Sequence, residues 1–266
     1  MTGQRMWMTA VLWTAPVAAW AQSPITIEQL LVKPARWQLT SSLQLQTGES
    51  VPGYSSLHSA WGTGLRYGIS PQLEINTRID QSELTRYTPA GSIREQGRSF
   101  SAGFNWLLLR ETRLPALLLQ ARTEIYSSTA GQTRSLPSVQ LGFTTYKSID
   151  PIVLSLFASL QHERDSSIDA FPGSEGDVVL EPGLGWHIEP AINFAVNPQI
   201  TLLGAMSYSQ RSPLQIDGVS NAVRERQVAL RLGVGYAPVR EHSIFLSAAM
   251  TSDAGGGLNL RWFWEF

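Results

Sequence analysis

The sequence contains no cysteine among its 266 residues, which excludes disulfide bonds and thiolate metal sites. It also carries little charge, with 15% charged residues and 20 basic side chains against 21 acidic ones. This balance argues against nucleic acid as a partner. Lys33 and Lys147 are its only lysines. The four histidines lack metal-ligand spacing, and no HExxH, GxSxG, phosphate-loop or dinucleotide motif occurs, so we expect no cofactor.

Long apolar runs are missing from residues 22–266. No segment there approaches the ~18 apolar residues of a spanning helix. Residues 1–21 themselves indicate a secretory signal. Arg5 precedes an apolar stretch at 6–17, and Ala19-Trp20-Ala21 predicts cleavage before Gln22. If the mature chain crosses a membrane, it must therefore do so with strands.

Residues 22–34 are predicted to form a short N-terminal segment, either periplasmic or a plug. Ile25, Ile27, Leu30 and Leu31 would share one side of a helical turn that Pro34 stops. Three interpretations stay open: a plug inside a barrel, a periplasmic handle for a partner, or a poorly ordered leader.

From residue 35 onward the chain alternates polar and apolar residues with the period of a strand, in about twelve segments. The expected strands are Ala35–Gly48, Ser56–Ile69, Gln72–Thr85, Gly97–Arg110, Leu114–Ser127, Pro137–Ile149, Ile152–Glu163, Val178–Val196, Ile200–Arg211, Arg226–Ala237, Ser243–Ser252 and Gly257–Phe266. Pro182 and Pro190 predict a bulge or bend in the long strand that contains them.

Short and long connectors alternate along this set of strands. The short ones are proline-containing turns at 68–72, 110–115, 148–151, 196–199 and 237–242, and the longer loops are expected at 49–55, 86–96, 128–136, 164–177, 212–225 and 253–256. Short periplasmic turns and longer external loops are typical of outer-membrane barrels. The predicted fold class is therefore all-β, a transmembrane antiparallel β-barrel of about 12 strands over residues 35–266, of the bacterial outer-membrane type.

The last ten residues place Leu258, Leu260, Trp262, Trp264 and Phe266 on one face of a strand. Leu260, Trp262, Trp264 and Phe266 resemble the C-terminal assembly signal of bacterial outer-membrane proteins. We expect this strand to pair with the first one and close the barrel. The expected partners are outer-membrane lipid and lipopolysaccharide, the outer-membrane assembly machinery and a small-molecule solute, with no nucleic acid.

If the apolar faces contact lipid, charged side chains of both signs line the lumen. The candidates are Arg36, Arg66, Glu74, Arg78, Asp80, Arg122, Glu124, Glu181, His187, Glu189, Arg231 and Arg261. They could neutralise one another across a narrow barrel, or line a polar path that favours neutral or zwitterionic solutes. His187 with Glu189 or Glu181, near Ser207, is the one imaginable hydrolase group, and we expect no enzyme.

A resemblance to a known family rests on one hairpin, Trp61-Gly-Thr-Gly-Leu-Arg-Tyr-Gly-Ile-Ser-Pro-Gln-Leu-Glu-Ile75, and on its echo at residues 196–204. The hairpin resembles those of the phenol-degradation meta-pathway outer-membrane transporter family. That family is distantly similar to long-chain fatty-acid transporters and to functional-amyloid secretion pores. The resemblance implies a channel over residues 35–266 without catalytic residues. Residues 23–34 are too short for the N-terminal coiled coil of the amyloid pores.

The function that these patterns favour is an outer-membrane channel or transporter for a small solute, with a narrow polar lumen. Its expected location is the Gram-negative outer membrane, after signal cleavage near Ala21. Two alternatives stay open: a secretion pore for a small exported protein or amyloid subunit, and a structural barrel without transport.

Overall fold

The structure is a computed structural model that describes residues 31–51, 54–89, 91–129, 132–169, 177–213, 215–216, 219–220, 225–239, 241–252 and 255–266. The expected signal peptide at 1–21 and residues 22–30 of the segment after it lie outside the described residues. No helix in the described ranges has the length and apolar character needed to span a membrane.

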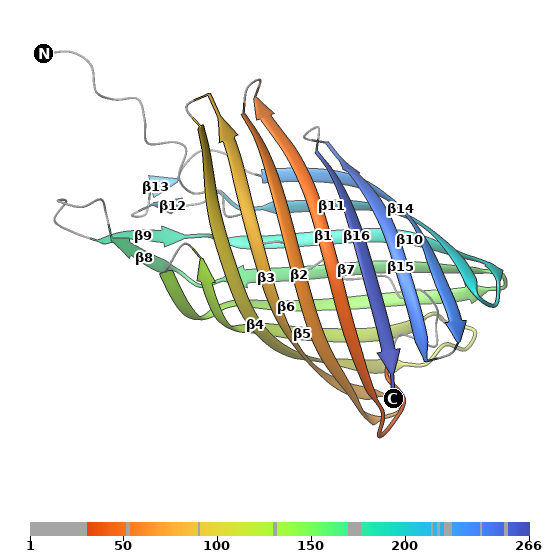
Figure 1. Cartoon of the computed structure of the whole chain (residues 1–266). Coiled ribbons are helices and arrows are strands. Elements are labelled where there is room, and N and C mark those ends of the chain that lie inside the picture. The colour runs from red at the N-terminus through yellow and green to blue at the C-terminus, as the bar shows by residue number, and fades with distance from the viewer. Residues whose placement is uncertain are drawn as a thin grey trace, which may run out of the picture.

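Twelve strands form one closed antiparallel barrel, in the order β1-β16-β15-β14-β11-β10-β7-β6-β5-β4-β3-β2. Figure 1 shows them as one tilted cylinder. The barrel strands are β1 (Trp37–Val51), β2 (Tyr54–Ser70), β3 (Leu73–Thr88), β4 (Gly91–Leu109), β5 (Ala116–Thr129), β6 (Gln132–Ile149), β7 (Ile152–Glu163), β10 (Leu184–Asn197), β11 (Ile200–Arg211), β14 (Glu225–Val239), β15 (His242–Thr251) and β16 (Gly256–Glu265). The predicted barrel of about twelve antiparallel strands is confirmed.

The barrel closes where the first strand meets the last. β1 pairs with β16 in register, with Leu39 opposite Trp264 and Leu43 opposite Leu260. Trp37 N–H donates to Phe266 O at 3.0 Å, and Phe266 N–H donates back to Trp37 O at 2.9 Å. This is the pairing that the C-terminal alternation predicts, and it removes both free edges of the sheet.

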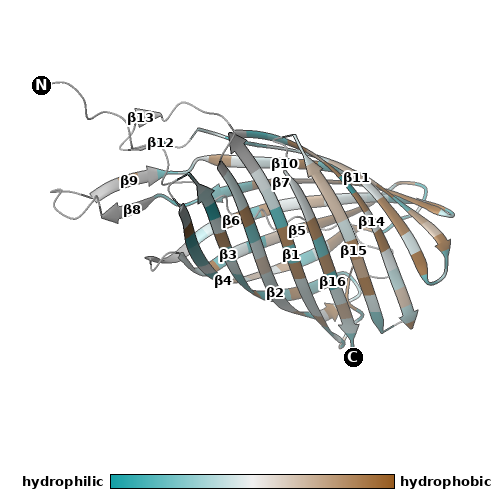
Figure 2. Ribbon diagram, turned by 45° about the horizontal axis from the view of Figure 1, so that its top comes forward, coloured by the Kyte–Doolittle hydropathy of each residue, from teal (hydrophilic) through white to brown (hydrophobic). Residues whose placement is uncertain are grey.

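The two faces of the barrel differ in polarity. Leu43, Leu260 and Trp262 are more than 40% exposed on the outside, whereas Gln38, Thr40 and Ser42 are buried on the inside. Figure 2 shows hydrophobic and hydrophilic residues alternating along the barrel strands. A water-soluble protein has its apolar face inside, so this inverted pattern suits a barrel wall in contact with lipid.

Two of the long loops expected from the sequence are hairpins instead. β3 and β4 stay paired as far as Thr88 and Gly91, and β5 and β6 as far as Thr129 and Gln132. The loops predicted at 86–96 and 128–136 are therefore wrong. In the first hairpin an ion pair between Arg86 and Glu95 at 2.7 Å joins the two strands inside the predicted loop. Cross-strand pairs of this kind stabilise a ladder that residue type alone does not predict.

The expected strand at 178–196 divides between two sheets. β8 (Ser166–Asp169), β9 (Asp177–Glu181), β12 (Gln215–Ile216) and β13 (Val219–Ser220) form a separate four-stranded sheet. Pro182 and Gly183 end β9, because proline has no N–H for a ladder and Gly183 has a φ of 71°. Glu181 therefore pairs with Gln215 in the small sheet, and its prediction as a lumen residue is wrong.

Candidate functional site: the charged lumen

Most of the predicted charges point to the inner face of the barrel, where they form three groups of contacts. The first lies near the end of the barrel where β1 begins and β16 ends. Glu74 is fully buried there and accepts hydrogen bonds from Arg66 Nε at 2.8 Å and from Asn105 Nδ2 at 2.6 Å. Arg66 also donates to Gln38 at 2.6 Å. These strong charge-assisted bonds compensate the buried carboxylate.

The chain before β1 completes this first group. Val32 is 2% exposed, and its N–H donates to Glu74 Oε2 at 2.8 Å. Residue 34 forms a parallel bridge with Gly68, and Ala35 N–H donates to Gly68 O at 2.8 Å. We call residues 31–36 the strap. The strap lies against the inner wall at this end of the barrel, and Gly68 lets it approach closely.

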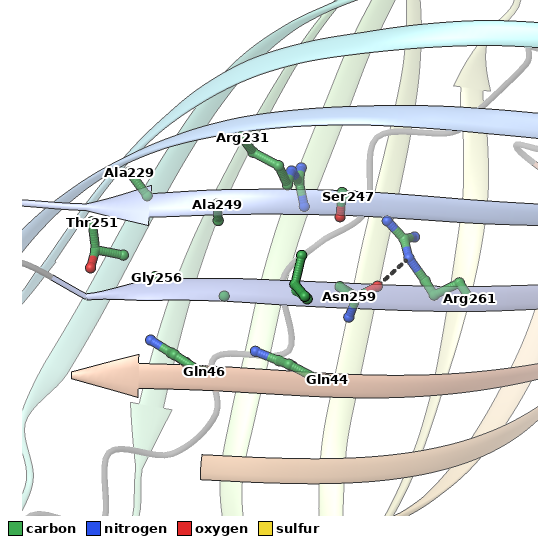
Figure 3. Close-up of a pocket in the computed structure, with 12 residues that line it drawn as sticks. Gln44, Gln46, Ala229, Arg231, Ser247, Ala249, Thr251, Gly256, Asn259 and Arg261 are labelled. Atoms are coloured by element: carbon green, nitrogen blue, oxygen red, sulfur yellow. Dashed lines mark hydrogen bonds between the residues drawn. The ribbon is translucent and has the colours of Figure 1, made fainter. Parts of the chain in front are cut away.

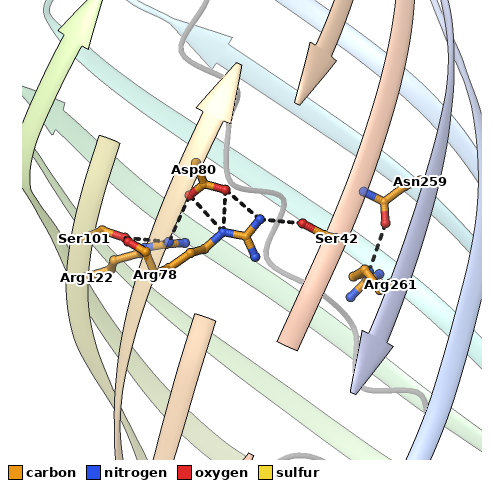
Figure 4. Close-up of polar contacts among 7 residues, drawn as sticks. All are labelled: Ser42, Arg78, Asp80, Ser101, Arg122, Asn259 and Arg261. Carbon is orange, nitrogen blue, oxygen red and sulfur yellow. Dashed lines mark hydrogen bonds and ion pairs between the residues drawn. The ribbon is translucent and has the colours of Figure 1, made fainter. Parts of the chain in front are cut away.

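The second group lies in the middle of the wall, on β1, β3, β4 and β5 (Figure 4). Arg78 forms an ion pair with Asp80 at 2.7 Å and reaches across to Ser42 Oγ, also at 2.7 Å. Arg122 lies 3.9 Å from the same Asp80 and donates to Ser101 Oγ at 2.7 Å. Two arginines thus share the carboxylate of Asp80, and the charge of Glu124 also acts on Arg122.

The third group lies on the opposite wall. Arg231 forms an ion pair with Glu189, whose side chain is 1% exposed. His187 Nε2 is 3.9 Å from the other oxygen of Glu189. Ser207 does not complete a hydrolase triad, because β10 and β11 pair His187 with Ser209 instead. Within the described residues no hydrogen bond between Ser207 and His187 is found. Glu189 therefore acts as the ion-pair partner of Arg231.

Arg261 on β16 differs from these arginines. It is 2% exposed, its Nε donates to Asn259 Oδ1 at 3.1 Å, and its Cζ lies 4.9 Å from the centre of the Phe245 ring. Phe245 is 1% exposed and belongs to an apolar cluster on the inner wall. The cluster consists of Ala191, Leu203, Ala205 and Phe245, with Phe263 packed against it. The lumen wall therefore has an apolar part beside its charged groups.

A pocket opens next to Arg261 (Figure 3). Its polar lining comes from Gln44, Gln46, Ser247, Thr251, Asn259, Arg231 and Arg261. The rest of the lining is mostly small: Ala229, Ala249, Gly256 and Gly257, with Leu258. The pocket thus combines amide and hydroxyl groups with a floor that has little side-chain bulk.

The remaining predicted residues fall outside these groups. Glu124 faces inward and accepts a hydrogen bond from Ser138 Oγ at 3.1 Å. Arg36 precedes β1 at the barrel end, and its side chain is exposed. Sequence reasoning missed the inward pairs Arg211–Glu163 at 2.6 Å and Arg86–Glu95. The alternation along each strand could have found Arg211 and Glu163, which end strands predicted with the correct bounds. Among the described residues no cluster could hold a metal ion.

Comparisons with known proteins address the fold. No family model matches the chain, and no curated protein matches it. An outer-membrane channel of Pseudomonas putida F1 is similar in structure, with a TM-score of 0.70 and 14% identity over 88% of this chain and 97% of that one. The β domain of the Bordetella autotransporter Brka gives 0.61 and 12% identity over 87% and 100%. The KdgM porin, solved with disordered oligogalacturonate, gives 0.51 and 6% identity over 86% and 99%.

At such low identity the likeness concerns the fold alone. The resemblance to the phenol-degradation family stays a prediction, since no family model supports it. The three neighbours carry the names of a channel, an autotransporter domain and a porin. The chain has the fold of a bacterial outer-membrane β-barrel with twelve strands.

Proposed function

We propose that this protein is an outer-membrane channel that lets a small solute pass through a narrow polar lumen. The observation that carries the proposal is the inner face of the closed barrel. There, ion pairs such as Arg78–Asp80 and Arg231–Glu189 line the wall from opposite sides, beside a pocket with amide and hydroxyl groups. These charged, amide and hydroxyl groups can hydrogen-bond a solute along the inner wall, which supports passage through the lumen.

The size of the barrel supports a narrow path. Twelve strands enclose a space between that of eight-stranded barrels, which side chains fill, and that of sixteen-stranded porins with open channels. Arginine side chains extend into this space from several strands, and the strap lies against the wall at one end. Both features narrow the lumen, so selective passage of a small molecule fits better than general diffusion.

The lining also favours a class of solute. Positive and negative charges are paired along much of the wall, while the cluster around Phe245 is apolar. Paired charges attract neither cations nor anions strongly, but they can form hydrogen bonds with polar groups of a solute. The apolar cluster can contact the hydrocarbon part of a solute. Small molecules with both a polar and an apolar part match this lining.

Export of a polypeptide is the second candidate function. It is favoured by the likeness to the Brka β domain and to the NalP translocator domain, which has a TM-score of 0.56 at 11% identity over 87% of each chain. The strap speaks for the solute channel instead, because a passing polypeptide would have to displace it from Glu74.

Conductance of the purified protein in planar bilayers tests the proposal. The full chain and a variant lacking residues 22–34 should both conduct, and the shortened variant should conduct more. Absence of current from both proteins would refute a channel and leave the structural barrel. Large solute-insensitive currents from the shortened variant alone, together with export of a fused passenger, would favour the secretion pore.

The location and partners belong to the same proposal. We expect the mature chain in the Gram-negative outer membrane, surrounded by lipid and lipopolysaccharide, and inserted by the assembly machinery. Leu260, Trp262, Trp264 and Phe266 lie on the outer face at the seam, where they are exposed. That exposure supports their role as the C-terminal assembly signal. Unheated protein that migrates faster than heated protein on gels would be the corresponding observation for the folded barrel.

A further inference from the structure

Arg261 is a deeply buried arginine that forms no ion pair with a carboxylate in the described part of the chain. The other arginines with shielded side chains on the inner wall have acidic partners. These pairs are Arg66–Glu74, Arg78–Asp80, Arg86–Glu95, Arg211–Glu163 and Arg231–Glu189, with Arg122 sharing Asp80. Arg261 has one neutral hydrogen-bond acceptor, Asn259, and the face of Phe245.

The surroundings of Arg261 add positive charge. Ser42 lies opposite Arg261 across the β1–β16 seam, and the guanidinium of Arg78 donates to that same serine at 2.7 Å. Arg231 and Arg261 line one pocket. The acid whose charge acts on Arg261 is Glu189, which already forms an ion pair with Arg231. A charge removed from water without a counter-ion is costly, so this part of the lumen favours an anion.

The pocket beside Arg261 has the donors to bind one. Gln44 faces Asn259 across the seam, and the two amides lie at the pocket with Arg261 in Figure 3. A guanidinium presents parallel N–H groups that match the two oxygens of a carboxylate. The Nε of Arg261 is engaged by Asn259, whereas no hydrogen bond from its two terminal nitrogens is found in the described ranges.

The rest of the pocket suits a small hydrocarbon group. Ala229, Ala249, Gly256 and Gly257 leave a floor without large side chains, and this floor continues along β14, β15 and β16. A multiply charged anion would need more than one uncompensated cation. A single surplus charge beside a small apolar floor therefore matches a monocarboxylate with a short apolar tail.

We propose that Arg261, with Gln44 and Asn259, forms a carboxylate-binding subsite in the lumen wall, and that it takes small apolar monocarboxylates. The assignment rests on the proposed channel function, for which it names the substrate class. It also makes Arg261 the residue that determines specificity along the path.

Binding can be measured without any current. Butyrate is the probe, and butyramide is its neutral counterpart of the same shape. Saturation-transfer NMR on the purified full chain in detergent, against protein-free micelles, should show saturable binding of butyrate. Loss of a charge-assisted bidentate contact should raise the dissociation constant for butyrate about 10-fold or more in Arg261→Met. Butyramide should bind wild type no better than Arg261→Met binds butyrate.

Two further variants guard against misfolding of Arg261→Met. Ala249→Leu fills the floor and leaves the arginine in place, so it should weaken butyrate binding by itself. The double variant Glu163→Gln/Arg211→Gln removes a paired charge elsewhere on the wall and should bind butyrate as wild type does. All variants must show the heat-dependent gel shift of a folded barrel.

In bilayers, butyrate should reduce the current through wild type, and Arg261→Met should lose this block. Equal binding of butyrate and butyramide to wild type, or unchanged butyrate binding by a folded Arg261→Met, would overturn the subsite. Absence of current from wild type with butyrate binding intact would instead refute the channel and leave the subsite standing. The two failures are therefore distinguishable.

Discussion

Gly68 offers a sharp test of the strap, because a single added carbon atom would meet its backbone. A Cβ at this position would lie 2.2 Å from Lys33 O and 2.5 Å from Val32 O. These oxygens belong to main chain, so they cannot turn away as a flexible side chain would. Gly68→Ala must therefore shift the strap away from β2 or distort the strand.

The size of the effect follows from two opposing contributions. Overpacking a close contact costs about 1–3 kcal/mol. The strap is held by the bond from Val32 N–H to Glu74, which contributes about 1.5–3 kcal/mol as a hydrogen bond to a charged group. Burial of the Val32 side chain contributes a further ~1.5–3 kcal/mol. The substitution therefore cancels part of the free energy that holds the strap to the wall. It should raise the fraction of molecules with a released strap about 5- to 150-fold.

The absence of native cysteine makes this fraction measurable. Val32→Cys places a unique thiol at the buried position of the strap, and its reaction rate with a maleimide reports release. Adding Gly68→Ala should raise that rate by the factor above. Gly185→Ala is the control, because its nearest contact would be an ordinary 3.8 Å. A labelling rate that Gly68→Ala leaves equal to that of the control would refute the packing argument.

Three other outcomes are expected. Deleting Phe266 removes two main-chain hydrogen bonds of the seam, so it should reduce the amount of heat-modifiable protein in the outer membrane without reducing export to the periplasm. The control Trp106→Ala should leave that amount unchanged. Unaltered assembly of the shortened chain would contradict the role of Phe266 in the assembly signal. Arg122→Gln should shift the reversal potential in a salt gradient toward cation selectivity, because Asp80 then has Arg78 as its one arginine partner. The control Arg98→Gln, at an exposed position, should leave the reversal potential unchanged. An unchanged potential in Arg122→Gln would place Arg122 off the path. Partial burial alone would raise the pKa of Glu111 in the turn at 110–115, but hydrogen bonds from Ser148 and the charge of Lys147 outweigh it and hold that pKa below 4.5. This contribution is present above the unfolded pKa and lost as pH falls through the folded one, so Glu111→Gln should lower the melting temperature at pH 7 and leave it unchanged near pH 2; an equal loss at both values would contradict the assignment.

The wall of the barrel could be predicted because each strand reports its two faces locally. Leu73, Ile75 and Ile79 face outward while Glu74, Arg78 and Asp80 face inward, as period-two alternation requires. Proline turns mark the short connectors, so strands such as Ile200–Arg211 have the predicted bounds. Closure followed from the apolar C-terminal strand, which would otherwise expose an edge.

The other end of the barrel could not be predicted, because contacts distant in sequence or across a turn decide it. The run at 86–96 has the composition of a loop, yet the pair Arg86–Glu95 extends the hairpin through it. Glu181 has the polarity of a lumen residue, but the break at Pro182 and Gly183 moves it into the small sheet. Strand membership at such a position depends on which neighbour pairs with it.

The site was predictable as a set of inward charges and not as a set of partners. Alternation places Arg78, Asp80 and Arg261 on the same face, but only the register shows which side chains of different strands meet. Arg78 and Asp80 are two residues apart on one strand and bind each other, whereas Arg261 faces Ser42. Whether an inward charge lacks a partner can be recognised only in the closed barrel, because the partner could come from any of the other strands.

In the proposed channel, the strap and Arg261 would act on two different properties of the lumen. At one end the strap lies against the wall and donates to Glu74, which also pairs with Arg66, so this carboxylate has its partners without a solute. In the middle, the chain supplies no carboxylate for Arg261 in its described part, so an anionic solute is the natural counter-ion. Release of the strap should therefore change how fast molecules pass, and replacement of Arg261 should change which molecules pass. A variant with both changes should conduct more than wild type and discriminate less between butyrate and butyramide. If the double variant discriminated as wild type does, the two functions would not be separable in this way.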